Sequence, residues 1–222
     1  MPRPIRAAIF DAYGTLLDVH SAMAAHAARI GPAWANVSAE WRTRQLEYTW
    51  IAALTGRHRD FAAITDESLR IVALRHGIDD AGLLADIAAS YRRLAAYPEV
   101  LGCLVDLRAR GLGRAILSNG TPDMLASAVD EAGIGPLLDD VLSVEAVGVY
   151  KPDPRVYALA TARFGCAPDE LLFVSSNGWD AHGAAAFGCR VAWVNRAGGP
   201  AEYGLEHSAT ILPDLTDLAR AL

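Results

Sequence analysis

Short runs of apolar residues recur along the chain, and most of them end at a polar residue or a glycine-containing turn. The first run, Ala7–Phe10, stops at Asp11 and is followed by the turn Tyr13-Gly14-Thr15. A run that is apolar at every position is typical of a strand buried on both faces, as in a parallel sheet. The same pattern predicts further strands at 114–117, 141–143, 171–174 and 190–194, and a last short strand near residue 211.

Segments with a helical pattern separate these strands after about residue 99. One covers 100–110 and ends at Gly111, and the next is opened by Pro122 and runs to about residue 132. A third ends near Phe164, and a fourth, rich in small residues, follows Asn177. Strands that alternate with helices indicate βαβ units. The sequence therefore predicts an α/β fold with a doubly wound, mostly parallel, Rossmann-like sheet.

Residues 19–97 interrupt this alternation, because their pattern is helical and contains no convincing strand. Ser21 and Ser38 are predicted as helix N-caps, since serine is favoured at that position. We expect residues 1–18 and 98–222 to form the α/β core domain and residues 19–97 to form an inserted helical cap subdomain.

Composition and charge exclude several classes of protein. Hydrophobic residues make up 52% of the chain, and 20 basic against 26 acidic side chains leave a net charge of −6. This balance predicts a globular protein without a nucleic-acid partner. No apolar run is long enough to span a membrane, and the N-terminus does not have the pattern of a signal peptide. Three widely spaced cysteines favour unpaired thiols in a reducing compartment, so we expect a cytoplasmic location.

Polar side chains gather where the predicted strands end. Asp11 follows the first strand, Ser118-Asn119 the second, and the loop containing Lys151 the third, while Ser175 to Asp180 follow the fourth. Ligands of open parallel sheets bind beyond the carboxyl ends of the strands. Each of these residues alone could be a turn former or a helix cap. Their coincidence at four strand ends instead predicts a shared site.

These clusters resemble the haloacid dehalogenase superfamily and, within it, the L-2-haloacid dehalogenases. The resemblance covers essentially the whole chain, including an arginine-bearing helix around Arg42. It rests on five segments: Asp11-Ala12-Tyr13-Gly14-Thr15-Leu16, Leu117-Ser118-Asn119-Gly120, Tyr150-Lys151-Pro152-Asp153, Val174-Ser175-Ser176-Asn177-Gly178-Trp179-Asp180 and Trp41-Arg42 with Gln45-Leu46-Glu47-Tyr48-Thr49-Trp50.

Two positions favour a dehalogenase over the phosphatases that make up most of this superfamily. Phosphatases carry an acid two residues after the nucleophile, because an alkoxide leaving group needs a proton. Here that position is Tyr13, whose phenol has a reference pKa of ~10 and is a poor acid at neutral pH. A magnesium-binding carboxylate of the phosphatases is replaced by Ser176, although Asp180 is retained. We therefore expect no metal and no other cofactor.

The resemblance implies a covalent mechanism. Asp11 attacks C2 of a 2-haloalkanoic acid opposite the halogen, and water then hydrolyses the aspartyl ester to a 2-hydroxy acid of inverted configuration. Lys151 is expected to keep Asp11 ionised, and Asp180 to position Lys151 and polarise the water, which Asn177 orients. Two hydroxyls, those of Thr15 and Ser175, are expected to hydrogen-bond the Asp11 carboxylate.

The resemblance also assigns the substrate contacts. Ser118 and Asn119 are expected to bind the substrate carboxylate where a helix begins. Arg42, together with Asn119, is expected to receive the halide product, and a solvated helix arginine is the alternative role of Arg42. An apolar wall is predicted to enclose the alkyl group, and core packing is the alternative role for each of its members: Tyr13, Leu46, Phe61, Tyr157 and Trp179. Tyr157 could also donate a hydrogen bond to the catalytic network.

Three interpretations of the chain stay open at this point. The first is hydrolytic dehalogenation of (S)-2-haloacids to (R)-2-hydroxy acids. A magnesium-dependent phosphatase of the same superfamily with diverged motifs is the second, and a catalytically silent binding protein is the third. The resemblance further suggests a homodimer. Three side chains at roughly helical spacing are either core between the cap and the α/β domain or part of the dimer contact: Trp41, Leu46 and Trp50.

Overall fold

The computed structural model describes residues 3–222. Residues 1–2, which the sequence assigns to the core domain, lie outside the described residues. Six strands form one sheet in the order β3-β2-β1-β4-β5-β6, and every pair is parallel. The strands are β1 (Ala7–Phe10), β2 (Gly113–Ser118), β3 (Asp140–Ser143), β4 (Leu171–Ser175), β5 (Arg190–Val194) and β6 (Thr210–Leu212). The predicted α/β fold is confirmed.

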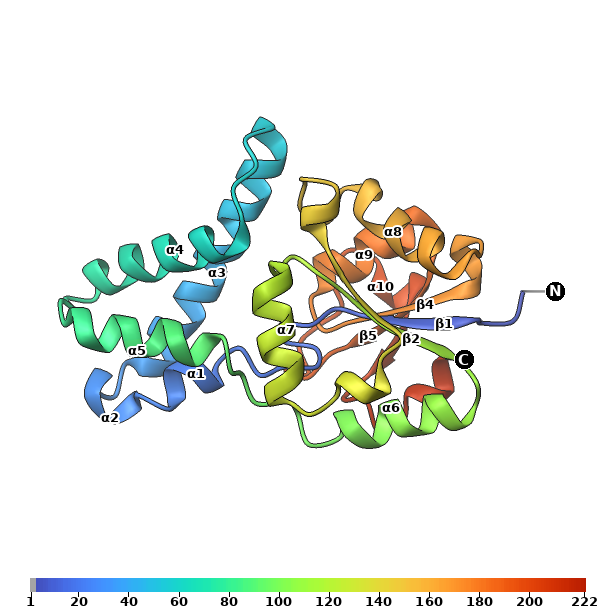
Figure 1. Cartoon of the computed structure of the whole chain (residues 1–222), viewed down its shortest axis with the longest axis horizontal. Helices are drawn as coiled ribbons and strands as arrows, with labels where there is room; N and C mark the ends of the chain where they lie inside the picture. The colour runs from blue at the N-terminus through green and yellow to red at the C-terminus, as the bar shows by residue number, and fades with distance from the viewer. Residues whose placement is uncertain (1–2) are drawn as a thin grey trace.

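Burial explains why these runs are strands. All four residues of β1 are fully buried because β1 lies in the middle of the sheet, with helices on both faces. In Figure 1, α8 and α9 lie on one side of the sheet and α6 lies on the other. The helices of the core are α6 (Val100–Ala109), α7 (Pro122–Glu131), α8 (Pro154–Phe164), α9 (Gly178–Phe187) and α10 (Leu205–Ser208).

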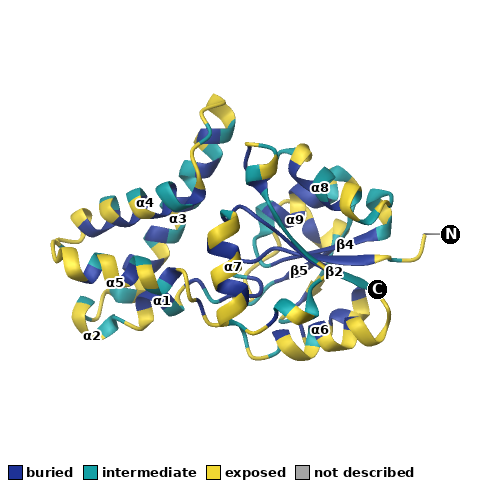
Figure 2. Ribbon diagram, in the orientation of Figure 1, coloured by how far each residue is buried: buried dark blue, intermediate teal, exposed yellow. Residues whose placement is uncertain are grey.

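Only helices are found between β1 and α6, and they stand beside the sheet as a separate group (Figure 1). They are α1 (Ser21–Ala24), α2 (Ala27–Ile30), α3 (Trp34–Thr55), α4 (Phe61–Arg75) and α5 (Ala81–Tyr91). We call them the cap. The faces of α3, α4 and α5 that meet one another are buried, and their outer faces are exposed (Figure 2).

The predicted N-caps of the cap helices are wrong. Ser21 is the first residue of α1 and donates its hydroxyl to the carbonyl of Asp18, and Ser38 is buried inside α3. A serine hydroxyl can hydrogen-bond to a nearby backbone carbonyl as well as cap a helix. The residue type alone therefore does not locate the start of a helix. Side-chain caps occur instead at Asp60 and Asp80, whose carboxylates accept from backbone N–H groups of α4 and α5.

Two chain segments join the cap to the core, and they pair with each other. Leu17 forms an antiparallel bridge with Ala96, and the backbone N–H of Asp18 donates to the carbonyl of Ala95 at 2.8 Å. The cap therefore leaves and re-enters the core at one place, next to the loop that follows β1. Among residues 3–222, no helix has the length and apolar character needed to cross a membrane.

Candidate active site

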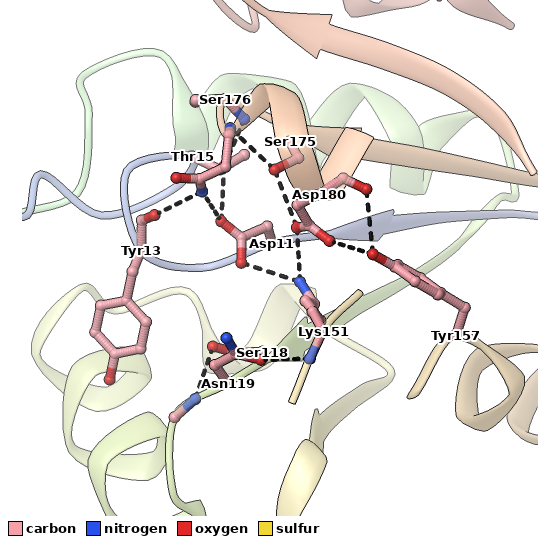
Figure 3. Close-up of polar contacts among 12 residues, drawn as sticks. Asp11, Tyr13, Thr15, Ser118, Asn119, Lys151, Tyr157, Ser175, Ser176 and Asp180 are labelled. Carbon is pink, nitrogen blue, oxygen red and sulfur yellow. Dashed lines mark hydrogen bonds and ion pairs between the residues drawn. The ribbon is translucent and has the colours of Figure 1, made fainter. Parts of the chain in front are cut away.

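The carboxylate of Asp11 lies at the carboxyl end of β1 and is held by three donors (Figure 3). The ammonium of Lys151 is 3.1 Å from Oδ1. The hydroxyl of Thr15 lies 3.1 Å from Oδ2, and the Nδ2 amide of Asn177 donates to the same oxygen at 2.8 Å. Asp11 is only 6% exposed. These contacts orient the carboxylate, and the predicted Thr15 hydrogen bond is present.

Lys151 is fully buried between two carboxylates. Its Nζ lies 2.8 Å from Asp180 Oδ2 as well as 3.1 Å from Asp11 Oδ1. Its backbone N–H donates to the side-chain oxygen of Asn119 at 3.2 Å, which fixes the loop that carries it. Burial alone would lower the pKa of Lys151, but the charges of Asp11 and Asp180 outweigh this and raise it. These two carboxylates therefore favour the ammonium form of Lys151.

Asp180 occupies the first turn of α9 and is completely buried. Its Oδ2 accepts from Lys151 and from the hydroxyl of Ser175, and its Oδ1 accepts from the hydroxyl of Tyr157 at 2.8 Å. Burial raises the pKa of this carboxyl group above its usual range, and the ion pair with Lys151 offsets only part of that effect.

The predicted hydrogen bond between Ser175 and Asp11 is wrong, because the Ser175 hydroxyl donates to Asp180 Oδ2 at 3.1 Å. The backbone N–H of Asn177 donates to the same hydroxyl oxygen at 3.1 Å and fixes its orientation. Both Asp11 oxygens already have donors from Lys151, Thr15 and Asn177. Ser175 therefore supports the second carboxylate and not the first.

The loop after β4 is docked onto the loop after β1. The backbone N–H of Ser176 donates to the Thr15 hydroxyl at 2.9 Å, and the Ser176 hydroxyl donates to the carbonyl of Gly14 at 2.7 Å. Gly14 has a φ of +90°, a backbone conformation that residues other than glycine rarely adopt. The G-T pair of the first motif thus shapes a turn on which the second loop rests.

A magnesium ion does not fit the donor set around Asp11. The cation of the phosphatase alternative would need acceptor atoms, but the amide nitrogen of Asn177 lies between Asp11 Oδ2 and the carbonyl of Tyr13, at 2.8 and 3.2 Å. Arg42 donates to the same carbonyl. Among residues 3–222, no cluster of three or more histidine, cysteine or acidic side chains is suited to a metal ion.

Arg42 reaches the site from α3 of the cap. One terminal nitrogen donates to the side-chain oxygen of Gln45 at 2.7 Å. The other lies 3.2 Å from the carbonyl of Tyr13 and 3.4 Å from Asn177 Oδ1. The guanidinium therefore connects the cap to the residue that contacts Asp11, and the structure brings this predicted residue to the core.

Aromatic side chains lie beside the predicted substrate position. The ring of Tyr13 is 5.5 Å from the ring of Phe61, and Tyr13 is 2% exposed. In the described chain, neither the Tyr13 hydroxyl nor the Trp179 indole nitrogen has a hydrogen-bond partner. Burial raises the pKa of the Tyr13 phenol far above its usual value, so it is no acid. Leu46 is half-buried on α3, one residue after Gln45.

Tyr157 lies on the far side of Asp180 from Tyr13 (Figure 3). Its hydroxyl donates to Asp180, and its ring packs against Phe173 and Phe187 of the core. Of the two roles predicted for Tyr157, the structure shows the hydrogen bond to the network.

Ser118 and Asn119 lie at the end of β2, just before α7 begins at Pro122. The Ser118 hydroxyl oxygen accepts from the backbone N–H of Gly120 at 3.2 Å, and Asn119 contacts the Lys151 backbone. Both side chains are buried beside the carboxylate cluster. A helix that begins here supplies N–H groups suited to an anion.

Two clefts are lined by residues of both the cap and the core. One, of about 650 Å³, is lined by Arg42 and Asn177. The other, of about 500 Å³, is lined by Trp50 and Trp179, whose rings meet edge to face. The Asp11 carboxylate is itself buried, which limits its access to bulk water.

Two buried polar residues of the cap, Gln45 and Tyr91, have no role predicted from the sequence. The side-chain oxygen of Gln45 accepts from both Arg42 and the Tyr91 hydroxyl. Tyr91 also stacks on Tyr13 with an interplanar angle of 11°. Gln45 follows Arg42 by three positions on one helix, a spacing that places two side chains on the same face. Nothing in the sequence pattern around Tyr91 marks it.

Comparison with known proteins agrees with this geometry. Residues 5–188 match the family of haloacid dehalogenase-like hydrolases. The chain is similar to (S)-2-haloacid dehalogenase 1 of Pseudomonas sp. (strain CBS-3), with 43% identity over 220 residues that cover 99% of this chain and 97% of the relative. It is also similar to (S)-2-haloacid dehalogenase 4A of Burkholderia cepacia, with 42% identity over 96% of this chain and 94% of the relative.

A solved structure of L-2-haloacid dehalogenase from Xanthobacter autotrophicus, with chloropropionic acid covalently bound, has the same fold. The TM-score is 0.85 and the identity 39%, with 97% of each chain covered. These relatives confirm the resemblance that the sequence motifs indicated. The chain belongs to the haloacid dehalogenase-like hydrolases.

Proposed function

We propose that this protein hydrolyses (S)-2-haloacids to (R)-2-hydroxy acids through an ester on Asp11. The observation that carries the proposal is the setting of the Asp11 carboxylate. It is enclosed, and its partners Lys151, Thr15 and Asn177 all donate to it. Relatives similar over nearly the whole chain are (S)-2-haloacid dehalogenases, and one relative holds chloropropionic acid covalently.

In the first step, one Asp11 oxygen attacks C2 of the substrate as the carbon–halogen bond breaks. The electron pair of that bond leaves with the halide, so no proton is required. This suits a site in which the residue two positions after the nucleophile is Tyr13, a phenol that keeps its proton. Arg42 stabilises the negative charge that develops on the halogen.

In the second step, water attacks the ester carbonyl of Asp11 and releases the hydroxy acid. We assign the polarisation of this water to Asp180 and its orientation to Asn177, whose amide already contacts Asp11. The rise in the pKa of Asp180 makes it a better proton acceptor than an ordinary aspartate. Lys151 holds both carboxylates in place, and Ser175 and Tyr157 hold Asp180.

The substrate carboxylate binds at Ser118 and Asn119, where α7 begins. Its alkyl group lies against Tyr13, Leu46, Phe61 and Trp179. The geometric support is that Tyr13 and Phe61 pack together and that Leu46 and Trp179 are only half-buried.

The test measures halide and phosphate release from (S)-2-chloropropionate and p-nitrophenyl phosphate, each with and without EDTA. We expect chloride release that is unaffected by EDTA, (R)-lactate as product, and no release by Asp11→Asn, because an amide is a poor nucleophile. Magnesium-dependent phosphate release would instead support the phosphatase alternative, and no release from either compound would support the silent binding protein.

We further propose a homodimer in which the C-terminal half of α3 forms the contact. Ile51 and Leu54 are 54% and 84% exposed there, three positions apart on one helix. Exposed apolar side chains of this kind favour a protein contact. Sedimentation should give twice the mass of one chain. Leu54→Glu should give the monomer, and Leu101→Glu, at an equally apolar exposed site of the core, should leave the dimer intact.

We also propose a cytoplasmic location. Its support is that all three cysteines, Cys103, Cys166 and Cys189, are unpaired thiols. Fractionation of cells that express the natural protein should recover dehalogenase activity with the cytoplasm. Recovery with the secreted or membrane fraction would contradict the proposal.

A further inference from the structure

Gln45 is a polar residue in the apolar interior of the cap, and both the oxygen and the nitrogen of its side-chain amide form hydrogen bonds. It is 1% exposed. Its side-chain oxygen accepts from Arg42 at 2.7 Å and from the Tyr91 hydroxyl at 3.1 Å, while its amide nitrogen donates to the Thr65 hydroxyl at 2.7 Å. A buried amide is costly unless it is paired. Its presence here therefore calls for a reason beyond packing.

The network fixes which way the Gln45 amide faces. The Thr65 hydroxyl gives its hydrogen to the carbonyl of Phe61, one turn earlier on α4, at 2.6 Å. It can then only accept from Gln45, so the Gln45 nitrogen must face Thr65 and the oxygen must face Arg42. The orientation is set within the cap, by residues of α3, α4 and α5, before any substrate is present.

The other end of Arg42 contacts the core more loosely. Its second terminal nitrogen lies 3.2 Å from the Tyr13 carbonyl and 3.4 Å from Asn177 Oδ1, both longer than the 2.7 Å contact with Gln45. An arginine side chain has many rotamers, and the cost of fixing them is considerable. The short bond to Gln45 is thus the contact that selects one guanidinium orientation.

We propose that Gln45 is a positioning residue that holds the Arg42 guanidinium toward the departing halide, with Thr65 anchoring its amide. This inference rests on the proposed function, because it takes Arg42 as the halide-binding residue. Gln45 does not touch substrate and acts through Arg42 alone. Preorganised donors stabilise charge that develops only in the transition state, so misdirecting Arg42 slows carbon–halogen cleavage selectively.

The test compares single-turnover halide release and ester hydrolysis in Gln45→Met, a change that keeps the shape of the side chain and removes its oxygen. We expect halide release to fall ~10- to 100-fold. The loss should be larger for (S)-2-chloropropionate than for the bromo compound, because chloride is the poorer leaving group. The rate of ester hydrolysis, measured on the pre-formed ester, should stay at the wild-type value.

Two further variants keep the test decisive. Thr65→Val frees the Gln45 amide without touching Arg42. It should raise the ratio of the bromide release rate to the chloride release rate, as Gln45→Met does, but by a smaller factor. It carries the test if Gln45→Met does not fold. Thr49→Val is the matched control, since Thr49 is also buried on α3, one turn further along. Among the residues that the structure describes, its hydroxyl bonds only to the carbonyl of Leu46. Its rate ratio should equal that of the wild type.

A folded Gln45→Met with the wild-type bromide-to-chloride ratio would overturn the inference. So would a loss that affects halide release and ester hydrolysis equally, or an equal loss in Thr49→Val, because either result indicates a structural role only. If the wild-type protein itself released no halide, the proposed function would fail, which is a different outcome from a failure of the role of Gln45.

Discussion

At the scale of single residues, the site depends on one ammonium group shared by two buried carboxylates. A buried carboxylate without a partner would take up a proton and lose its nucleophilic or basic character. Lys151 lies within 3.1 Å of both Asp11 and Asp180, so the cluster carries one negative charge more than positive. Thr15, Ser175, Asn177 and Tyr157 supply the remaining hydrogen bonds. These neutral donors stabilise the excess charge.

Replacing Arg42 by lysine should impair catalysis although the charge is kept. An ammonium group lacks the planar fork that lets Arg42 contact Gln45, Tyr13 and Asn177 together. We expect kcat with (S)-2-chloropropionate to fall ~10²-fold or more. Arg44→Lys is the matched control, because Arg44 lies on the same helix and, within residues 3–222, pairs only with Glu47. Near-wild-type turnover of Arg42→Lys would show that the planar fork of Arg42 does not stabilise the departing halide.

The pH dependence of ester hydrolysis should follow Asp180 on the acid side. Burial raises the pKa of Asp180 and the ion pair with Lys151 only partly offsets this, so its proton is gained above the ordinary aspartate value of ~3.9. The protonated form has lost the charge that pairs with Lys151 and cannot take a proton from water. Single-turnover hydrolysis should therefore slow as the pH falls toward that raised pKa.

The alkaline side of the same profile reports on Lys151. Its pKa is raised by Asp11 and Asp180, so the ammonium persists above the ordinary value of ~10.4 and no loss is expected below it. Circular dichroism at each pH provides the control for unfolding. An acid limb at or below pH ~4 would show that Asp180 has an ordinary pKa and would contradict this assignment.

At the scale of secondary-structure elements, α9 packs so closely on α8 and on the Lys151 loop that one position admits only glycine. A Cβ at Gly183 would lie 2.6 Å from Pro152 and would overlap the Tyr157 hydroxyl. We expect Gly183→Ala to lower the free energy of unfolding by about 1–3 kcal/mol. It should also displace Tyr157 from Asp180 and slow ester hydrolysis. Chemical denaturation measures the loss of stability, and single-turnover kinetics measure the rate of ester hydrolysis.

Gly102→Ala is the control for this prediction. Gly102 lies in α6, where an added Cβ meets no heavy atom within 4 Å, so alanine should be neutral or stabilising by about 0.5–1 kcal/mol. If Gly183→Ala were as stable and as active as the wild type, Tyr157 would not need its present place beside Asp180.

The strands and the catalytic cluster could be predicted from the sequence, but the hydrogen-bond partner of Ser175 could not. Residues 7–10 could be assigned to a strand because burial on both faces leaves no polar position in the run. The cluster of Asp11, Lys151 and Asp180 was predictable because parallel strands bring their carboxyl ends to one edge. The partner of Ser175 was not, since a hydroxyl at a strand end can turn toward either carboxylate.

The cap was less predictable than the core. Helical periodicity shows that residues 19–97 form helices, but it does not show which faces of α3, α4 and α5 meet. The contact between Gln45 and Thr65 joins two helices whose relative rotation depends on packing around Trp41 and Tyr91. The polar network behind Arg42 therefore emerges only from the three-dimensional structure.

At the scale of the whole molecule, the machinery is divided between two parts of the chain. The core supplies the carboxylates and Lys151, and the cap supplies Arg42. Apart from the paired connecting segments, the cap loop before α4 meets the core where the Tyr150 hydroxyl donates to the carbonyl of Arg59 and where His58 contacts Glu145 at 2.9 Å. Tyr150 directly precedes Lys151, so this contact lies next to the catalytic cluster.

The central claim is that Asp11 attacks carbon, and the origin of the product oxygen tests it most directly. With enzyme in excess over (S)-2-chloropropionate in H₂¹⁸O, a single turnover should give lactate that carries ¹⁶O at the hydroxyl, because that oxygen comes from the Asp11 carboxylate. Mass spectrometry should find ¹⁸O in the peptide that contains Asp11. Lactate with ¹⁸O from the first turnover, together with an unlabelled Asp11, would show that water attacks the substrate directly and would contradict the covalent mechanism.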